Sequence, residues 1–186
     1  MRTFIAIELP EEIKKGLAQV QEQLKGSGAA AAWTRPEGIH LTLKFLGDVP
    51  EPKVPEIMNG LTAAVQGTAR FRVEVNGAGA FPNGRNPRVL WVGVAGDLEK
   101  LASLHAAVEG AMSKLGFEAE DRKFSPHLTL ARIRYLRPRD NWQKVIDGVK
   151  GVNLGGFEAD RVSLMKSELK PSGAVYTEVG SVELKK

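Results

Sequence analysis

The sequence contains no cysteine, only three histidines, and few aromatic residues, which make up 6% of the chain. Without cysteine there can be no disulfides, thiolate metal sites, iron–sulfur clusters or cysteine nucleophile. Long hydrophobic runs are also missing: none approaches the roughly 18 residues that a membrane span needs, and residues 1–12 become acidic too early for a secretory signal. We therefore expect a cytoplasmic protein whose chemistry uses histidine, carboxylate, hydroxyl or amine groups.

Charge of neither sign dominates. The chain has 186 residues, with 26 Lys plus Arg, 22 Asp plus Glu, and a net charge of +4. Such an excess permits a polyanionic partner, but it is too small for a histone-like surface or a basic tail. The composition is typical of a soluble globular protein, and the length suits one domain or two small lobes.

What the sequence does contain is a repeat. The tetrapeptide His-Leu-Thr-Leu occupies residues 40–43 and recurs 87 positions later, at residues 127–130. Apolar residues at helical spacing predict an amphipathic helix that begins near Glu11 before the first copy, and another that begins near Leu98, after a possible N-cap at Asp97. Each predicted start lies 29 residues before its histidine.

The segments that follow the tetrapeptides are also similar. A proline-containing turn leads in each half to a second predicted helix, entered at Lys53 and at Asp140. Two strand-like runs then follow in each half, and they are residues 71–75, 88–94, 157–165 and 174–180.

These patterns predict an α+β fold. We expect a single bilobal domain over residues 1–186, with an internal repeat of approximately residues 11–95 and 98–182. The two pseudo-symmetric lobes would each consist of an antiparallel sheet with helices, around a central cleft. Symmetry would bring both His-Leu-Thr-Leu strands to that cleft.

The tetrapeptide places one imidazole and one hydroxyl on the same side of a strand. Alternation points His40 and Thr42 to one face and the two leucines to the other, and the same holds for His127 and Thr129. Two facing imidazoles can act as general base and general acid, while the hydroxyls donate to a phosphate oxygen. A single His-x-Thr is usually a matter of packing, but a duplicated one at equivalent positions favours function.

The sequence resembles a known family along most of its length. The similarity lies in RTFIAIELP, HLTLKFLGDVP, FPNGRNPRVLWVGV, SPHLTLARI, VSLMKSEL and VYTEV. The paired His-x-Thr-x motifs resemble those of the two-histidine (2H) phosphoesterase superfamily, and the rest resembles its RNA 2',3'-cyclic phosphodiesterases, also called 2'-5' RNA ligases. The resemblance implies a LigT-like fold and hydrolysis of RNA 2',3'-cyclic phosphate ends to 2'-phosphates. Some members also join or cleave 2'-5' linkages.

The resemblance also implies roles for four residues. His40 and His127 would be the catalytic pair, with Thr42 and Thr129 holding the phosphate. Family accounts make His127 the base and His40 the acid, whereas the near symmetry of the sequence leaves this direction open. We expect no cofactor, no metal and no membrane partner, and a monomer that acts on RNA with 2',3'-cyclic phosphate ends, such as tRNA fragments.

Two further residues are candidates for substrate binding. Phe45 and Arg132 each lie five residues after a motif histidine. A ring and a guanidinium there would stack on a nucleobase or reach a phosphate. Strand alternation instead places them on the leucine side, unless the strand ends or bulges first. Trp91 and Tyr176 are expected in the core.

Three alternatives remain open. His105 is expected to be structural, but a zinc site built from His40, His105 and His127 would be a rival. A second alternative is a non-catalytic RNA-binding module in which the histidines only hydrogen-bond phosphate. The third is a phosphodiesterase for small cyclic phosphates, such as that of ADP-ribose.

Overall fold

The computed structural model describes residues 1–27 and 30–186. The helices are α1 (Glu11–Lys25), α2 (Val54–Val65), α3 (Leu98–Lys114) and α4 (Trp142–Asp147). The strands are β1 (Arg2–Ile7), β2 (Ala32–Trp33), β3 (Leu41–Asp48), β4 (Phe71–Phe81), β5 (Val89–Gly96), β6 (His127–Arg132), β7 (Asn153–Ala159), β8 (Arg161–Lys170) and β9 (Gly173–Glu183). Short 3₁₀ turns occupy Pro36–Gly38 and Glu51–Lys53.

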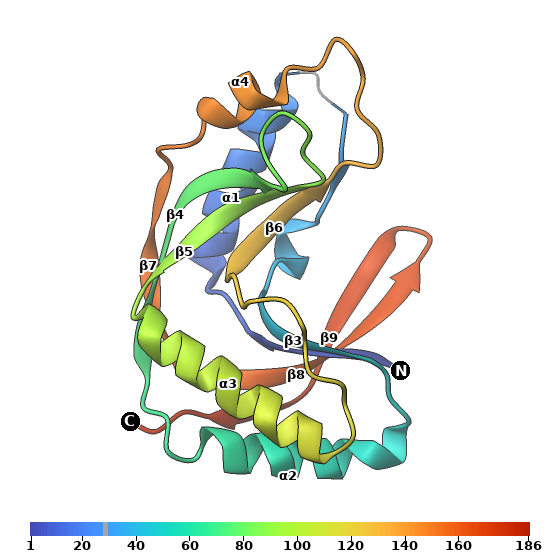
Figure 1. Ribbon diagram of the computed structural model, residues 1–186, viewed down its shortest axis with the longest axis vertical. Coiled ribbons are helices and arrows are strands. Elements are labelled where there is room, and N and C mark those ends of the chain that lie inside the picture. Colours follow the sequence, from blue (N-terminus) through green and yellow to red (C-terminus); the bar gives the residue numbers. More distant parts are fainter. Residues whose placement is uncertain (28–29) are drawn as a thin grey trace.

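The strands form two antiparallel sheets. Sheet A has the order β3-β1-β8-β9, and sheet B has the order β2-β6-β5-β4-β7. Figure 1 shows sheet B with α1 and α4 in the upper part of the molecule, and sheet A with α2 and α3 in the lower part. The predicted α+β fold with two lobes is confirmed.

Each lobe takes elements from both halves of the sequence. Sheet A combines β1 and β3 with β8 and β9, whereas β4 and β5 join β6 and β7 in sheet B. The helices cross over as well: α3 contacts β3, and α1 contacts β7. The side-chain amide of Gln21 on α1 fastens this arrangement, because it donates to the Leu130 carbonyl of β6 at 2.9 Å. The two halves are therefore interlocked.

The predicted run at residues 157–165 is wrong as a single strand. β7 ends at Ala159 and β8 begins at Arg161, and the two strands belong to different sheets. The apolar positions change from odd to even at this point, with Phe157 and Ala159 before Asp160 and Val162 and Leu164 after it, so the alternation does mark the break that a single strand ignores. As a result, the second half has one strand more than predicted.

Helix starts agree closely with the sequence. Helices α1 and α3 begin at the predicted residues. Asp97 precedes α3 as predicted, but its carboxylate accepts from the Arg72 backbone N–H at 3.0 Å instead of capping the helix. Helix α4 begins at Trp142, two residues later than Asp140, because the Asn141 side chain accepts from a backbone N–H of the first turn.

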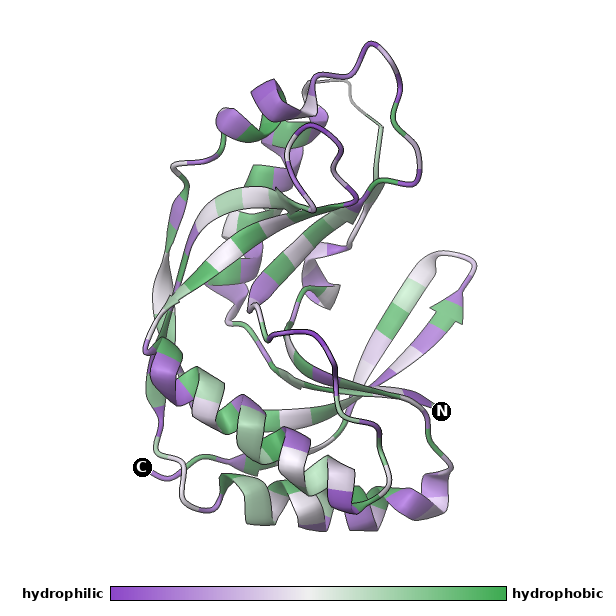
Figure 2. Cartoon of the chain, in the orientation of Figure 1, coloured by the Kyte–Doolittle hydropathy of each residue, from purple (hydrophilic) through white to green (hydrophobic). Residues whose placement is uncertain are grey.

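The core lies between each sheet and its own helices. The four motif leucines belong to it, with at most 4% of their surface exposed: Leu41, Leu43, Leu128 and Leu130. Figure 2 shows the apolar segments along the strands and the polar segments in the upper loops and in the loop that leads to β6. Within the described part of the chain, no helix is long and apolar enough to cross a membrane. Because the leucines point into the core, the histidines and threonines lie on the opposite side of β3 and β6. We call this side the motif face.

Candidate active site

The two motif strands lie close together although they belong to different sheets. His40 directly precedes β3, the edge strand of sheet A, and His127 is the first residue of β6. Strands β3 and β6 have Cα atoms within 8 Å of each other. The short strand β2 covers the far end of β6 only, where it pairs with Ala131 and Arg132. The His127 end of β6 is thus left open toward β3.

Both imidazoles are oriented by the same kind of hydrogen bond. Nδ1 of His40 lies 2.8 Å from the Gly38 carbonyl, and Nδ1 of His127 lies 2.7 Å from the Ser125 carbonyl. Each carbonyl belongs to the residue two positions earlier. Because a carbonyl only accepts, each Nδ1 must carry a proton, so that Nε2 is the nitrogen available for chemistry.

Aromatic rings pack edge-on against both imidazoles. The Phe4 and Tyr176 rings lie 5.5 Å and 5.4 Å from the His40 ring, and the Phe81 ring lies 5.0 Å from the His127 ring. Such contacts restrict the rotation of each imidazole. No sequence pattern indicated Phe4 or Phe81, because these contacts depend on which strands pair.

The histidines differ at Nε2. In His40, Nε2 lies 3.1 Å from Oε2 of Glu8. The other oxygen of that carboxylate lies 2.6 Å from Nζ of Lys14, which also donates to the Glu37 carbonyl at 2.8 Å. In His127, Nε2 has no hydrogen-bond partner among the described residues.

This difference breaks the pseudo-symmetry of the site. Partial burial raises the pKa of the Glu8 carboxyl, but hydrogen bonds from His40 and Lys14 outweigh burial and lower the pKa to about 2. Glu8 is therefore ionised at neutral pH. Both nitrogens of His40 then face acceptors, whereas in His127 only Nδ1 does.

Comparison with known proteins agrees with this geometry. A family model described as LigT like Phosphoesterase matches residues 7–91 and again residues 92–176. The chain belongs to this phosphoesterase family. The predicted resemblance to two-histidine phosphoesterases is thereby confirmed, and the double match reflects the repeat.

Several relatives of this LigT-like phosphoesterase have named activities. An RNA 2',3'-cyclic phosphodiesterase of Methanothermobacter thermautotrophicus is 36% identical over 179 residues, which are 96% of each chain. One of Thermotoga maritima is 38% identical over 176 residues, covering 95% of this chain and 91% of the relative. A crystal structure of a Thermus thermophilus protein covers all of this chain and 98% of its own, with a TM-score of 0.81 and 31% identity.

Bulges interrupt both motif strands at equivalent positions in this phosphoesterase. The pairing of β1 with β3 skips Leu43, and the pairing of β5 with β6 skips Leu130, each three residues after its histidine. A bulge reverses the alternation of the residues beyond it. Phe45 and Arg132 are therefore exposed on the motif face, and the Phe45 ring lies 6.0 Å from the Phe4 ring. Simple alternation placed these two residues on the leucine side, which argued against binding roles. The bulges remove this argument.

His105 does not join the motif histidines. Its ring stacks on Phe124 at 3.9 Å, and its Nε2 lies 3.9 Å from Glu109. Burial lowers the pKa of His105, although Glu109 acts in the opposite direction. Among the residues described, no group of three or more His, Asp or Glu side chains could hold a metal ion. The zinc site of His40, His105 and His127 is therefore not formed.

Replacing Glu8 by glutamine is expected to lower stability in a pH-dependent way. The pKa of Glu8 is lower in the folded protein than its ordinary value of 4.5, so the unfolded chain binds the proton more readily. The contribution of the charge is complete above about pH 4.5 and is lost as the pH falls toward about 2. At pH 7 the Glu8→Gln variant should be less stable by at most about 3 kcal/mol. Urea unfolding from pH 7 to pH 2 should show the two curves converging, and a difference that stays constant with pH would contradict the prediction.

Proposed function

We propose that this chain hydrolyses the 2',3'-cyclic phosphate ends of RNA to 2'-phosphates, with His127 as general base and His40 as general acid. The observation that carries the proposal is the unequal environment of two equally anchored imidazoles, one open at Nε2 and the other facing a carboxylate. The relatives named RNA 2',3'-cyclic phosphodiesterase, 36% and 38% identical over nearly the whole chain, support the substrate.

The proposed reaction is an in-line displacement at phosphorus. Nε2 of His127 accepts a proton from water as the water oxygen bonds to phosphorus. The bond between phosphorus and the 3' oxygen breaks, and Nε2 of His40 donates a proton to that oxygen. The products are a 2'-phosphate and a 3'-hydroxyl. A 5'-hydroxyl in the place of water would form a 2'-5' linkage through the same groups.

Glu8 and Lys14 prepare His40 for this role. The carboxylate faces Nε2 of His40 in the free protein and so orients the ring, while Lys14 neutralises the carboxylate so that it does not repel the incoming phosphate. Lys14 remains a partner for Glu8 when the imidazole turns its proton toward the leaving oxygen. Glu8 is thus a positioning residue that acts through His40.

The threonines and the two bulge-exposed residues would hold the substrate. Thr42 and Thr129 lie half-buried on the motif face, and their hydroxyls would donate to the non-bridging phosphate oxygens, which gain charge during attack. Phe45 and Arg132 would hold the terminal nucleobase by stacking, as single-stranded RNA is commonly bound.

Product analysis of an oligonucleotide with a 2',3'-cyclic end tests the proposal. The expected product carries a 2'-phosphate, and EDTA should leave the rate unchanged because the scheme uses no metal. A 3'-phosphate product would overturn the choice of leaving oxygen. Tight binding without turnover would favour an RNA-binding module, and faster turnover of ADP-ribose cyclic phosphate would favour a small-molecule substrate.

A further inference from the structure

The loop between α3 and β6, residues 115–126, is fastened to the lobe of sheet A. Nζ of Lys44 donates to the Glu118 carbonyl at 2.8 Å, and Nζ of Lys53 donates to the Leu115 carbonyl at 2.9 Å. Later in the loop, Phe124 lies stacked on His105 with only 5° between the ring planes. The last part of the loop includes Ser125, whose carbonyl orients His127. The loop therefore packs against the lobe of sheet A and also helps to orient His127.

This loop presents two adjacent cations, Arg122 and Lys123. Both side chains are exposed, and neither has an ion pair or hydrogen bond with any residue that the structure describes. The acidic residues of the loop, Glu118, Glu120 and Asp121, come earlier, toward α3. Arg122 and Lys123 thus lie on the β6 side of these carboxylates, and three residues separate Lys123 from the start of β6.

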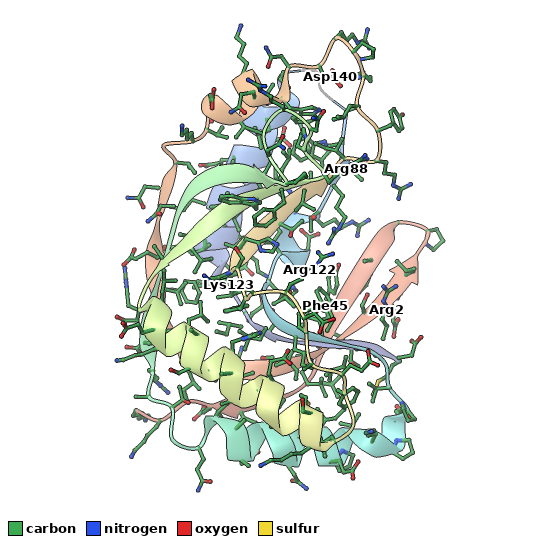
Figure 3. All side chains as sticks on the ribbon, viewed as in Figure 1. Arg2, Phe45, Arg88, Arg122, Lys123 and Asp140 are labelled. Atoms are coloured by element: carbon green, nitrogen blue, oxygen red, sulfur yellow. The ribbon has the colours of Figure 1, made fainter. Side chains whose placement is uncertain are left out.

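The two cations lie on the stretch of chain that joins the two lobes. Figure 3 shows Arg122 and Lys123 on the stretch of chain that passes from the lower lobe to β6. The same stretch is strongly hydrophilic in Figure 2. Lys123 precedes His127 by four residues, so their Cα atoms are at most about 14 Å apart. A long cationic side chain from this position reaches the surroundings of the reacting phosphate without being part of the motif.

We propose that Arg122 and Lys123 bind the phosphodiester that joins the terminal nucleotide to the rest of the RNA chain. The proposal rests on the proposed function and names the substrate class more narrowly, as an oligonucleotide instead of a cyclic mononucleotide. The two cations have no partner among the described residues, and they lie near a site that holds one phosphate. They would therefore attract a second phosphate. Only a substrate of two or more nucleotides supplies one. Contacts to the backbone carry no sequence information, so the preference concerns chain length and not base identity.

The test compares a 2',3'-cyclic mononucleotide with a trinucleotide that has the same end. In the double variant Arg122→Gln/Lys123→Gln, kcat/KM for the trinucleotide should fall about tenfold at low salt, while that for the mononucleotide stays unchanged. The slope of log kcat/KM against log salt for the trinucleotide should become less steep by about 0.7, because the two cations neutralise one phosphate and each neutralised phosphate on a single strand contributes roughly 0.7.

A matched control removes the same charge elsewhere. Lys100 on α3 and Lys150 before β7 are exposed, and the Lys100→Gln/Lys150→Gln variant should behave as the wild type on both substrates. If the Arg122→Gln/Lys123→Gln variant lost kcat/KM equally on both substrates, or lost none on the trinucleotide, the proposal would be overturned. If the wild type turned over neither substrate, the proposed function would fail. The role of the two cations could then still be tested by binding, with fluorescence anisotropy as the measurement and a trinucleotide with a 2'-phosphate end as the probe. An unchanged affinity in the Arg122→Gln/Lys123→Gln variant would contradict that role.

Discussion

Replacing His127 by alanine is expected to lower kcat on a cyclic-ended oligonucleotide at least about a hundredfold, and replacing His40 by glutamine should have an effect of similar size. Each substitution removes one proton transfer from the transition state. Glutamine is preferred at position 40 because that side chain is only 3% exposed and its loss would leave a void. Single-turnover rates measure the effect directly, and unfolding curves close to that of the wild type show that the fold is retained.

The two substitutions should affect opposite sides of the pH profile. The wild-type rate is expected to be bell-shaped, since the base must be neutral and the acid must be protonated. Without His127, the fall in rate on the acidic side should disappear. Without His40, the fall on the alkaline side should disappear. The reverse pattern would exchange the two roles, and a variant that keeps near full activity would remove its histidine from the mechanism.

A better leaving group distinguishes the acid from the base in a second way. A nucleotide diester that releases 4-nitrophenolate has no need for protonation of the departing oxygen. The His40→Gln variant should therefore recover most of its lost rate on this substrate, whereas the His127→Ala variant should not. Equal recovery in both variants would contradict the assignment.

The sequence was sufficient for those features of the site that depend on local order. Alternation along a strand correctly separated His40 and Thr42 from the leucines that face the core, and apolar residues at helical spacing located α1 and α3. These features follow from the period of a strand or a helix, which a short stretch of sequence determines. The same logic holds in the second motif, where Thr129 again lies half-buried between two buried leucines.

Features that depend on pairing between distant segments could not be predicted. Glu8 reaches His40 only because β1 lies beside β3, and Phe81 reaches His127 only through the order of strands in sheet B. The bulges at Leu43 and Leu130 are equally hidden, since a skipped residue is defined by its partner strand. Alternation without the bulges would have turned Phe45 and Arg132 away from the motif face.

The bulge at Leu43 also explains why a lysine within β3 is buried. Lys44 follows the skipped residue and lies on the core side of β3, with its side chain only 4% exposed. Its Nζ lies 2.9 Å and 3.0 Å from the two oxygens of Glu109 on α3. It also donates to the Glu118 carbonyl of the loop that carries Arg122 and Lys123. One ammonium group thus connects β3, α3 and this loop.

Breaking this pair is expected to destabilise the fold strongly. The Glu109→Ala variant leaves a buried ammonium with a single carbonyl partner, which should lower the free energy of unfolding by about 3 to 5 kcal/mol. The double variant Lys44→Met/Glu109→Leu replaces the pair with apolar side chains of similar size and should regain most of that loss. Glu118→Ala is the matched control, because this glutamate is exposed and contributes only its backbone carbonyl, so its effect should stay within about 0.5 kcal/mol. Urea denaturation of the four proteins measures all three effects, and a Glu109→Ala variant as stable as Glu118→Ala would show that Lys44 remains hydrated in solution.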